Sequence, residues 1–286
     1  MNKVILLDYG MFMFRAVFSS LHSQMKPSYT AMAMILSSLK KIGIDPEDQV
    51  FVACDGQKNW RKQIDPNYKA NRKEQREQYD IDWDRVWMEF DNLLEELDSA
   101  TDWHILKNDL LEADDWMAGG AKYFKDKEVI VVSFDADLEQ TWNFSNVKIY
   151  SPLIKYKGTK GAYKIKPPEF NVYKLIASKI EKEKTDNLIS PILTQEDYET
   201  REKLINLLTL PDFVEKIITD KLSSLPDNKE LDLSCLSSPS IRNRFEEIYN
   251  GKNKITYEEV LEYAEKKKNK KKGSKNGSKR KSLTNS

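Results

Sequence analysis

Three runs of consecutive apolar residues lie in the first half of the chain, at residues 4–8, 50–55 and 129–135. Each has the length and the β-branched content of a strand. Apolar positions that follow one another, rather than alternate with polar ones, are typical of strands buried on both faces, as in a parallel sheet. Residues 103–108 predict a fourth strand.

Helical patterns separate these strands and dominate the second half of the chain. Those between the strands cover residues 29–42, 83–97 and 112–124. The alternation predicts an α/β fold, with a mostly parallel central sheet and flanking helices. After Pro167 and Pro168 the pattern becomes helical throughout, at residues 171–180, 196–208, 211–222, 241–249 and 257–268. We therefore predict an α/β domain at residues 1–167 and a smaller all-helical region at residues 168–265.

The last part of the chain, residues 266–286, differs in composition from everything before it. It holds ten of the 46 lysines and arginines and none of the 46 acidic residues, so 36 basic residues face 46 acidic ones in the remainder. With one apolar residue, Leu283, this tail cannot offset its ordering entropy by burial, and we expect it to be disordered. A basic tail on an acidic body favours a polyanionic partner, although a tail that only solubilises the protein has the same composition.

Cysteine, histidine and long apolar runs are scarce, which excludes several classes of protein. Two cysteines do not make a disulfide framework, and His22 and His104 are too few for a histidine-based metal site or triad. No run approaches the ~20 apolar residues that span a bilayer. The first residues are interpreted as a strand rather than a signal peptide, so we expect a cytoplasmic protein whose chemistry depends on carboxylates.

Carboxylates follow the three clearest strands. Asp8, Asp55 and Asp135 each end an apolar run, EADD at residues 112–115 begins a helix, and Asp137 follows Asp135 by two positions. A single Asp at a strand end is often only a turn former, but the carboxyl ends of parallel strands meet at one edge of a sheet. Crowded carboxylates repel strongly without cations. Hard oxygen ligands therefore predict a site for two Mg²⁺ ions, or Mn²⁺ in their place.

A basic cluster, KNWRKQIDPNYKANRKEQR at residues 58–76, lies inside the acidic body. It holds seven lysines and arginines against two acids, with Trp60 and Tyr68 interleaved. Cations interleaved with aromatic rings favour contact with single-stranded nucleic acid. An exposed helix face that two aromatic residues anchor to the body is the alternative. A further lysine cluster, IKYKGTKGAYKIK at residues 154–166, alternates around two glycines and predicts a β-hairpin.

These blocks, in this order, resemble the 5′-nuclease (flap endonuclease-like) family, whose core is a PIN-like α/β domain. The blocks are LLDYGMFMFRA, ACDGQKNWRKQIDPNYKANR, EADDWMA and VVSFDADLEQ, and the likeness extends over residues 4–190. The resemblance implies that these acids bind metal: Asp8, Asp55, Glu112, Asp114, Asp115, Asp135 and Asp137. It adds Glu183 and Asp186 from KEKTDN, where the family has a G-D-x-x-D-N loop at the start of a helix–three-turn–helix element. Lys182 and Glu183 stand where the family has Gly and the first Asp.

The resemblance also implies that residues 56–80 form an arch-like segment that admits a single-stranded 5′ end. The nucleic-acid contacts that it implies are Arg61, Lys62, Tyr68, Lys69, Arg72, Lys179, Lys182 and Lys184, with Tyr68 as a stacking partner. Lys69 and Arg72 would also stabilise the transition state, beside the catalytic acids Asp8, Asp55, Asp114 and Asp135.

The function that the resemblance implies is metal-dependent 5′-to-3′ hydrolysis of RNA–DNA hybrids, duplex DNA and flap or fork DNA. Among phage members this activity removes RNA primers during replication. It implies a single-strand DNA-binding protein and a sliding clamp as partners, a monomer without membrane contact, and the host cytoplasm if a phage encodes the chain. Two alternatives stay open. One is a structure-specific DNA-binding protein that no longer cleaves, and the other is a PIN-like ribonuclease acting on single-stranded RNA.

Overall fold

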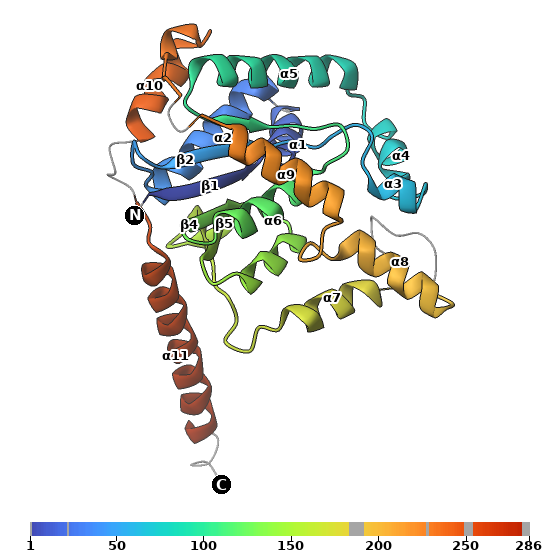
Figure 1. Ribbon diagram of the computed structural model, residues 1–286. Helices are drawn as coiled ribbons and strands as arrows, with labels where there is room; N and C mark the ends of the chain where they lie inside the picture. The colour runs from blue at the N-terminus through green and yellow to red at the C-terminus, as the bar shows by residue number, and fades with distance from the viewer. Residues whose placement is uncertain (1, 22, 183–191, 227–228, 249–253, 282–286) are drawn as a thin grey trace.

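A six-stranded sheet with the strand order β3-β2-β1-β4-β5-β6 forms the centre of the computed structural model (Figure 1). The structure describes residues 2–21, 23–182, 192–226, 229–248 and 254–281, the last twelve of these by backbone alone. The strands are β1 Lys3–Asp8, β2 Gln49–Ala53, β3 His104–Leu106, β4 Glu128–Val132, β5 Val147–Tyr156 and β6 Thr159–Lys164. The first five run parallel, and β6 pairs antiparallel with β5. The predicted fold class, the four strands and the hairpin are thereby confirmed.

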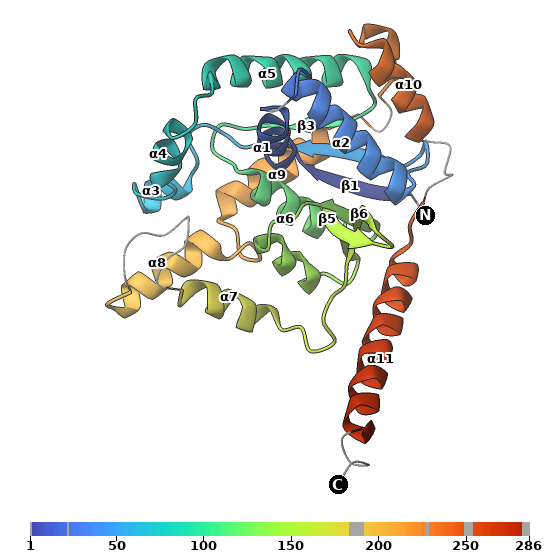
Figure 2. The same ribbon diagram turned by 180° about the vertical axis from the view of Figure 1, so that it is seen from behind.

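Each central strand buries both of its faces, as the continuous apolar runs predict. Ile5 and Leu7 of β1 pack on one side of the sheet, against α1 Tyr9–Ser20, α2 Pro27–Ile42, α5 Trp83–Ala100 and α10 Pro239–Ile248. Val4 and Leu6 pack on the other side, against α6 Ala113–Tyr123, α9 Asp212–Ser224 and the short helix η1 Asp137–Asn143. Figure 2 shows α2 and α5 beyond one face of the sheet and α6 beyond the other.

Part of the helical second region packs directly onto the α/β core. Helices α7 Val172–Ile180 and α8 Gln195–Ile205 do pack together, through Val172 and Ile176. Helix α9, however, lies on the α6 face of the sheet and α10 on the α2 face, so both belong to the main core. The remaining short helices are α3 Arg61–Ile64, α4 Asn71–Glu77 and η2 Leu233–Cys235. Chain from beyond residue 205 therefore holds the α/β core together on both sides.

The last helix, α11 Tyr257–Lys281, extends further than predicted and points away from the body (Figure 1). Val260 is buried, and the Tyr263 ring lies 5.2 Å from the Tyr156 ring of the hairpin. Once these first turns are anchored, each further lysine adds one helical hydrogen bond at little cost in propensity. The structure thus continues as helix through most of the segment predicted to be disordered. Among the described helices, none is both long and apolar enough to cross a membrane.

Candidate functional site

Four aspartates line one cavity of about 750 Å³ at the carboxyl edge of the sheet. Asp8 ends β1, Asp55 and Asp135 follow the neighbouring strands β2 and β4, and Asp114 lies in the first turn of α6. The surroundings of Gly10 show that two of these aspartates, Asp55 and Asp8, lie close together. A Cβ atom there would lie 3.2 Å from Oδ2 of Asp55 and 3.8 Å from Oδ1 of Asp8. The four sequence-predicted catalytic acids are therefore brought together, in what we call the carboxylate cavity.

Backbone and hydroxyl donors fix the orientation of these carboxylates. Oδ1 of Asp8 accepts a hydrogen bond from the Met11 amide at 2.9 Å, and its Oδ2 accepts one from the Ser133 hydroxyl at 2.8 Å. The same hydroxyl oxygen accepts the Asp135 amide at 3.0 Å. Oδ1 of Asp55 accepts the Ala113 amide at 2.9 Å. Two of the four acids are thus held by the ends of helices, and Ser133 ties Asp8 to the Asp135 backbone.

Crowding and burial in this cavity disfavour the charged form of its carboxyl groups. Burial raises the pKa of Asp8 to about 7, and the charges of Asp55 and Asp135 contribute to the increase. Burial also raises the pKa of Asp55, with Glu112 adding to it. For Asp114, burial first and the charge of Asp135 second hold the pKa well above its ordinary value. These groups must bind protons or cations to coexist.

The donor set fits a hard divalent cation, because it consists of carboxylate oxygens without histidine or cysteine. Across the described ranges, no group of three or more Asp, Glu, His or Cys side chains is already arranged to hold a metal ion. Carboxylates that repel one another are expected to stand apart until a cation lies between them.

Asp115 lies elsewhere than predicted, and so does Arg61. Asp115 is fully buried and accepts hydrogen bonds from both terminal nitrogens of Arg61, from Trp60 Nε1 and from the Glu112 amide, all within 3.0 Å. Arg61 is 1% exposed and stacks over the Trp60 ring at 4.4 Å. In this arrangement the Asp115 carboxylate and the Arg61 guanidinium are directed at each other inside the protein, not at the carboxylate cavity. The roles predicted for them, metal binding and phosphate contact, stay predictions.

Glu112 is bound by cations of the arch-like segment. Its carboxylate accepts Arg61 Nη1 at 3.0 Å, the Tyr68 hydroxyl at 3.0 Å and Lys69 Nζ at 2.5 Å. Burial raises the pKa of Glu112, but Lys69 and Arg61 outweigh it and hold the pKa below its ordinary value. Tyr68 is 4% exposed, so its ring packs inside the protein in this arrangement, and its stacking on a base stays a prediction. Trp60 and Tyr68 anchor the segment, as the alternative interpretation stated.

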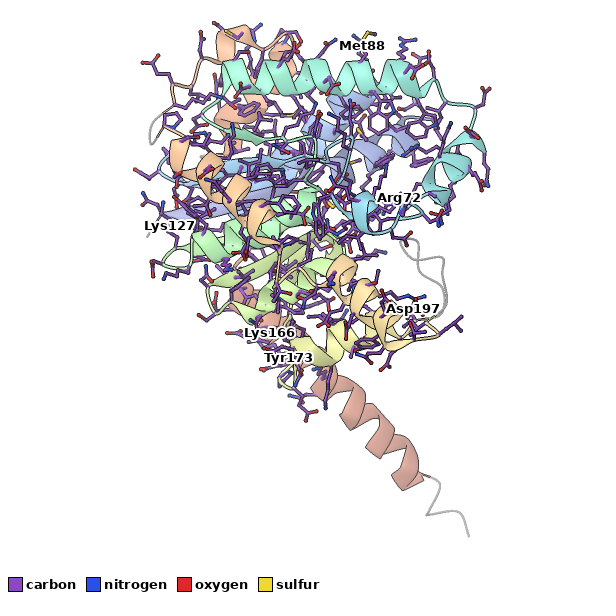
Figure 3. The ribbon with its side chains drawn as sticks, turned by 45° about the vertical axis from the view of Figure 1, so that its right-hand side comes forward. Arg72, Met88, Lys127, Lys166, Tyr173 and Asp197 are labelled. Carbon is purple, nitrogen blue, oxygen red and sulfur yellow. The ribbon has the colours of Figure 1, made fainter. Side chains whose placement is uncertain are left out.

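Three cations of the arch-like segment line cavities at this edge of the sheet. Lys69 and Arg72 line the carboxylate cavity together with the aspartates. Lys62 is exposed and lines an adjoining cavity of about 450 Å³, which also includes Lys69 and Arg72. Figure 3 shows Arg72 on this segment, on the same side of the molecule as Asp197 of α8. Phosphate contact by these three cations stays a prediction.

The remaining predicted residues lie toward α7. Asp137 does not line the carboxylate cavity, and its carboxylate forms an ion pair with Lys179 of α7. In this pair the positive charge of Lys179, a predicted nucleic-acid contact, neutralises the negative charge of Asp137, a predicted metal ligand. Lys182 is exposed at the end of α7, and its carbonyl accepts Arg201 Nη1 at 2.9 Å. Glu183, Lys184 and Asp186 lie outside the described residues.

Aromatic residues form a part of the site that the sequence interpretation missed. Five rings line the carboxylate cavity: Phe14, Phe18, Tyr79, Trp83 and Phe134. A signal was present in YGMFMFRAVF, because Phe14 and Phe18 are four residues apart and share one face of a helix that directly follows Asp8. No helix was predicted at that position. Acidic, basic and aromatic side chains therefore all line the cavity.

We expect the metal-free protein to lose stability as the pH rises, and divalent cations to restore it. The pKa of Asp8 goes from 3.8 when unfolded to about 7 when folded, so the folded state retains a proton that the unfolded state releases. The resulting stability is fully present below the unfolded pKa and is lost as the pH rises through about 7. The loss from Asp8 is on the order of 4 kcal/mol. Urea unfolding in EDTA and in Mg²⁺, at pH 5 and pH 8, measures it.

The Asp8→Asn variant serves as the control, because the asparagine cannot titrate; it should lack the Asp8 contribution to the pH dependence and keep those of Asp55 and Asp114. An unfolding free energy that Mg²⁺ leaves unchanged at pH 8 would contradict a cation site among these carboxylates.

Comparisons with known proteins place this geometry in context. The family model for the 5′-3′ exonuclease N-terminal resolvase-like domain matches residues 3–171. Ribonuclease H of Enterobacteria phage T4 is 29% identical over 111 residues, and the match spans 37% of this chain and 36% of that protein. The curated relative is therefore matched over about a third of its length.

Two solved structures of bacteriophage T5 proteins show the same fold. The T5 D15 protein co-crystallised with metal ions has a TM-score of 0.55, with 16% sequence identity over 78% of this chain and 98% of that one. The T5 D15 flap endonuclease in a complex with DNA and metal ions has a TM-score of 0.50, with 15% identity over the same shares. Because the family model covers more than half of the 286 residues, this chain belongs to the 5′-3′ exonuclease family of nucleases, whose N-terminal resolvase-like domain it contains.

Proposed function

We propose that this chain hydrolyses phosphodiester bonds from the 5′ end of nucleic acids with the help of divalent metal ions. The observation that carries the proposal is the carboxylate cavity. Four aspartates from three neighbouring strands and one helix line it, and Lys69 and Arg72 line the same cavity. Acids and cations that line one cavity suit a substrate that is a phosphate and requires a metal ion.

The chain's own residues bind and orient the substrate. Asp8, Asp55, Asp114 and Asp135 would hold two Mg²⁺ ions, or Mn²⁺, which supply the positive charge that activates a water and stabilises the leaving oxygen. Lys69 and Arg72 bind the non-bridging oxygens of the same phosphate and stabilise the charge that develops in the transition state. Ser133 and the Met11 amide hold Asp8 in place during the reaction.

The Lys69 ammonium has a second partner that a substrate must displace. It lies 2.5 Å from Glu112 Oε1, and both side chains are largely buried. The Lys69 backbone has a positive φ of 57°, which lies in the left-handed region. A phosphate that enters the cavity offers this ammonium another anionic partner, which leaves the Glu112 charge less fully neutralised, although Arg61 and Tyr68 still donate to it. Glu112 therefore remains in the proposed ligand set.

The proposed substrates are RNA–DNA hybrids, duplex DNA and flap or fork DNA, with primer removal during phage DNA replication as the biological role. Support comes from the name of the T4 relative, a ribonuclease H, and from the T5 flap endonuclease structure that contains DNA and metal ions. Helices α7 and α8 offer the duplex-binding element, with Lys182 between them. A single-strand DNA-binding protein and a sliding clamp complete the proposal as partners of a monomeric enzyme in the host cytoplasm.

A panel of 5′-labelled substrates tests the activity. Purified protein is incubated with an RNA–DNA hybrid, a 5′-flap DNA and plain single-stranded RNA, each in Mg²⁺ and in EDTA. We expect short labelled products from the hybrid and the flap in Mg²⁺, and none in EDTA. Tight binding without cleavage, in Mg²⁺ and in Mn²⁺, would instead support a DNA-binding protein that does not cleave. Cleavage confined to single-stranded RNA would support a PIN-like ribonuclease.

A further inference from the structure

Exposed lysines gather where the β5–β6 hairpin meets the last helix, α11, away from the carboxylate cavity. None of them lines that cavity, and the proposed hydrolysis gives them no role. Figure 1 and Figure 2 both show α11 on the other side of the molecule from α4 and α8. We call this surface the lysine ridge, and its described members are Lys155, Lys157, Lys160, Lys266, Lys267 and Lys268.

Two lysines of the ridge face each other across the hairpin. Lys155 of β5 and Lys160 of β6 are directly opposite in the antiparallel register, and both are exposed. Like charges in such positions destabilise a sheet. None of the described acids forms an ion pair with either ammonium, and Lys41 Nζ, which donates to the Lys160 carbonyl, adds a third positive charge. An anion bound here would remove this repulsion.

A pair of tyrosine rings joins the hairpin lysines to those of α11. The centroids of the Tyr156 and Tyr263 rings are 5.2 Å apart. Lys157 Nζ lies 4.9 Å from the Tyr156 centroid, and Lys267 Nζ lies 5.0 Å from the Tyr263 centroid. Each ammonium is thus held over one ring of the same pair, so two positive charges from different elements lie close together. The hairpin and the helix therefore present one basic surface.

The acids of α11 lie in its first turns, and only cationic and neutral residues follow them. Two of these acids already face a lysine, Glu258 at 3.9 Å and Glu262 at 3.3 Å. Beyond Glu265 the helix has ten lysines and arginines and no acid. Its backbone stays helical over residues 266–281, which extend about 24 Å at about 1.5 Å per residue. The lysine ridge is therefore an extended row of positive charge rather than a pocket.

Such a row fits the phosphates of a nucleic-acid duplex. A duplex carries one negative charge for about every 1.7 Å of its axis, so an extended row of cations can contact several phosphates at once. Within the described part of the hairpin and α11, every aromatic ring is buried or half-buried. The bases of a single strand would therefore find no exposed ring on which to stack. Lysine binds phosphate as a point charge and does not need a particular base sequence.

We propose that the lysine ridge binds the backbone of a nucleic-acid duplex, independently of base sequence and away from the bond that is cut. This inference rests on the proposed function, because it takes the substrate to be a nucleic acid. It adds a second binding surface, on the side of the molecule opposite α4 and α8. This surface keeps the enzyme on a duplex between cleavage events.

The salt dependence of duplex binding tests the lysine ridge without depending on cleavage. The full chain is titrated into a fluorescently labelled, blunt-ended duplex in EDTA at several KCl concentrations, and anisotropy gives the binding constant. Two double variants remove charge, Lys155→Gln with Lys160→Gln in the hairpin and Lys267→Gln with Lys268→Gln in the helix. Each should lower the slope of log Kobs against log[KCl] by about 2 and weaken binding about tenfold, because two phosphate contacts are lost.

Two controls separate loss of charge in the ridge from other effects of substitution. Lys216→Gln removes an exposed lysine of α9 that pairs with Asp220, outside the ridge, and should leave both the slope and the affinity at wild-type values. Lys155→Arg with Lys160→Arg keeps both positive charges and should retain the wild-type slope.

The outcomes distinguish this proposal from the proposed function. Equal slopes in the wild type and in both glutamine variants would overturn the duplex site, even if the protein cleaves every substrate. Weaker binding of an oligo-dT strand or of polyglutamate, with duplex binding unchanged, would overturn it in favour of a single strand or an acidic protein. Ridge-dependent duplex binding without cleavage in Mg²⁺ would support the ridge and overturn the proposed hydrolysis.

Discussion

The Asp135→Asn variant should cleave a 5′-flap substrate on the order of 10³-fold more slowly than the wild type, with nearly unchanged binding. Asparagine has the same shape, and its amide oxygen can still accept the Asp137 amide, which lies 2.8 Å from Asp135 Oδ1. What the substitution removes is one of four negative charges in the carboxylate cavity. We therefore expect weaker cation binding and weaker stabilisation of the transition-state charge. The fold, and the cations Lys69 and Arg72 that line the cavity, should be unchanged.

Single-turnover cleavage and fluorescence anisotropy, measured on the same flap substrate, separate the two effects. Asp220→Asn is the matched control, since Asp220 is an exposed acid on α9 that pairs with Lys216, away from the cavity. A cleavage rate for Asp135→Asn equal to that of this control would show that the carboxylate cavity is not the catalytic centre.

The Arg61→Ala variant should lose about 3–5 kcal/mol of unfolding free energy, because it leaves buried carboxylates without their cation. Asp115 is fully buried and its Oδ1 lies 2.7 Å from Arg61 Nη2, and Glu112 shares the same guanidinium. Arg61 Nε also donates to the Leu204 carbonyl at 2.9 Å, which joins the arch-like segment to the end of α8. One side chain therefore connects three parts of the fold.

Urea unfolding measures this loss, and Lys62→Ala is the neighbouring control because Lys62 is exposed. Arg61→Lys should restore little, since an ammonium cannot form the paired hydrogen bonds that a guanidinium makes with one carboxylate. A loss for Arg61→Ala as small as that for Lys62→Ala would mean that the buried network contributes nothing to stability.

The features that depended on local pattern were predictable from the sequence. Continuous apolar runs such as residues 129–135 identify buried parallel strands, and the order of the strands places their carboxyl ends at one edge. Asp8, Asp55 and Asp135 could be grouped on that basis alone. The β5–β6 hairpin was also predictable, because Gly158 and Gly161 permit positive φ angles of 89° and 98° within an alternating pattern.

The pairing of particular charged side chains could not be predicted from the sequence. In EADD, three acids look equivalent in the sequence, yet Asp114 faces the cavity while Asp115 faces Arg61 in the interior. Their separation follows from the helical turn of about 100° between adjacent residues, which directs neighbours to different surroundings. Likewise, nothing in the basic cluster marked Arg61 as buried and Lys62 as exposed. Pairing across 54 residues of sequence is a property of the tertiary fold.

The central claim is that the carboxylate cavity binds the catalytic metal ions, and anomalous diffraction from Mn²⁺-soaked crystals tests it most directly. We predict anomalous peaks within ligand distance of Asp8, Asp55, Asp114 and Asp135, and no peak beside Asp115. Peaks confined to other parts of the surface, with these four carboxylates left without a bound ion at saturating Mn²⁺, would contradict the account.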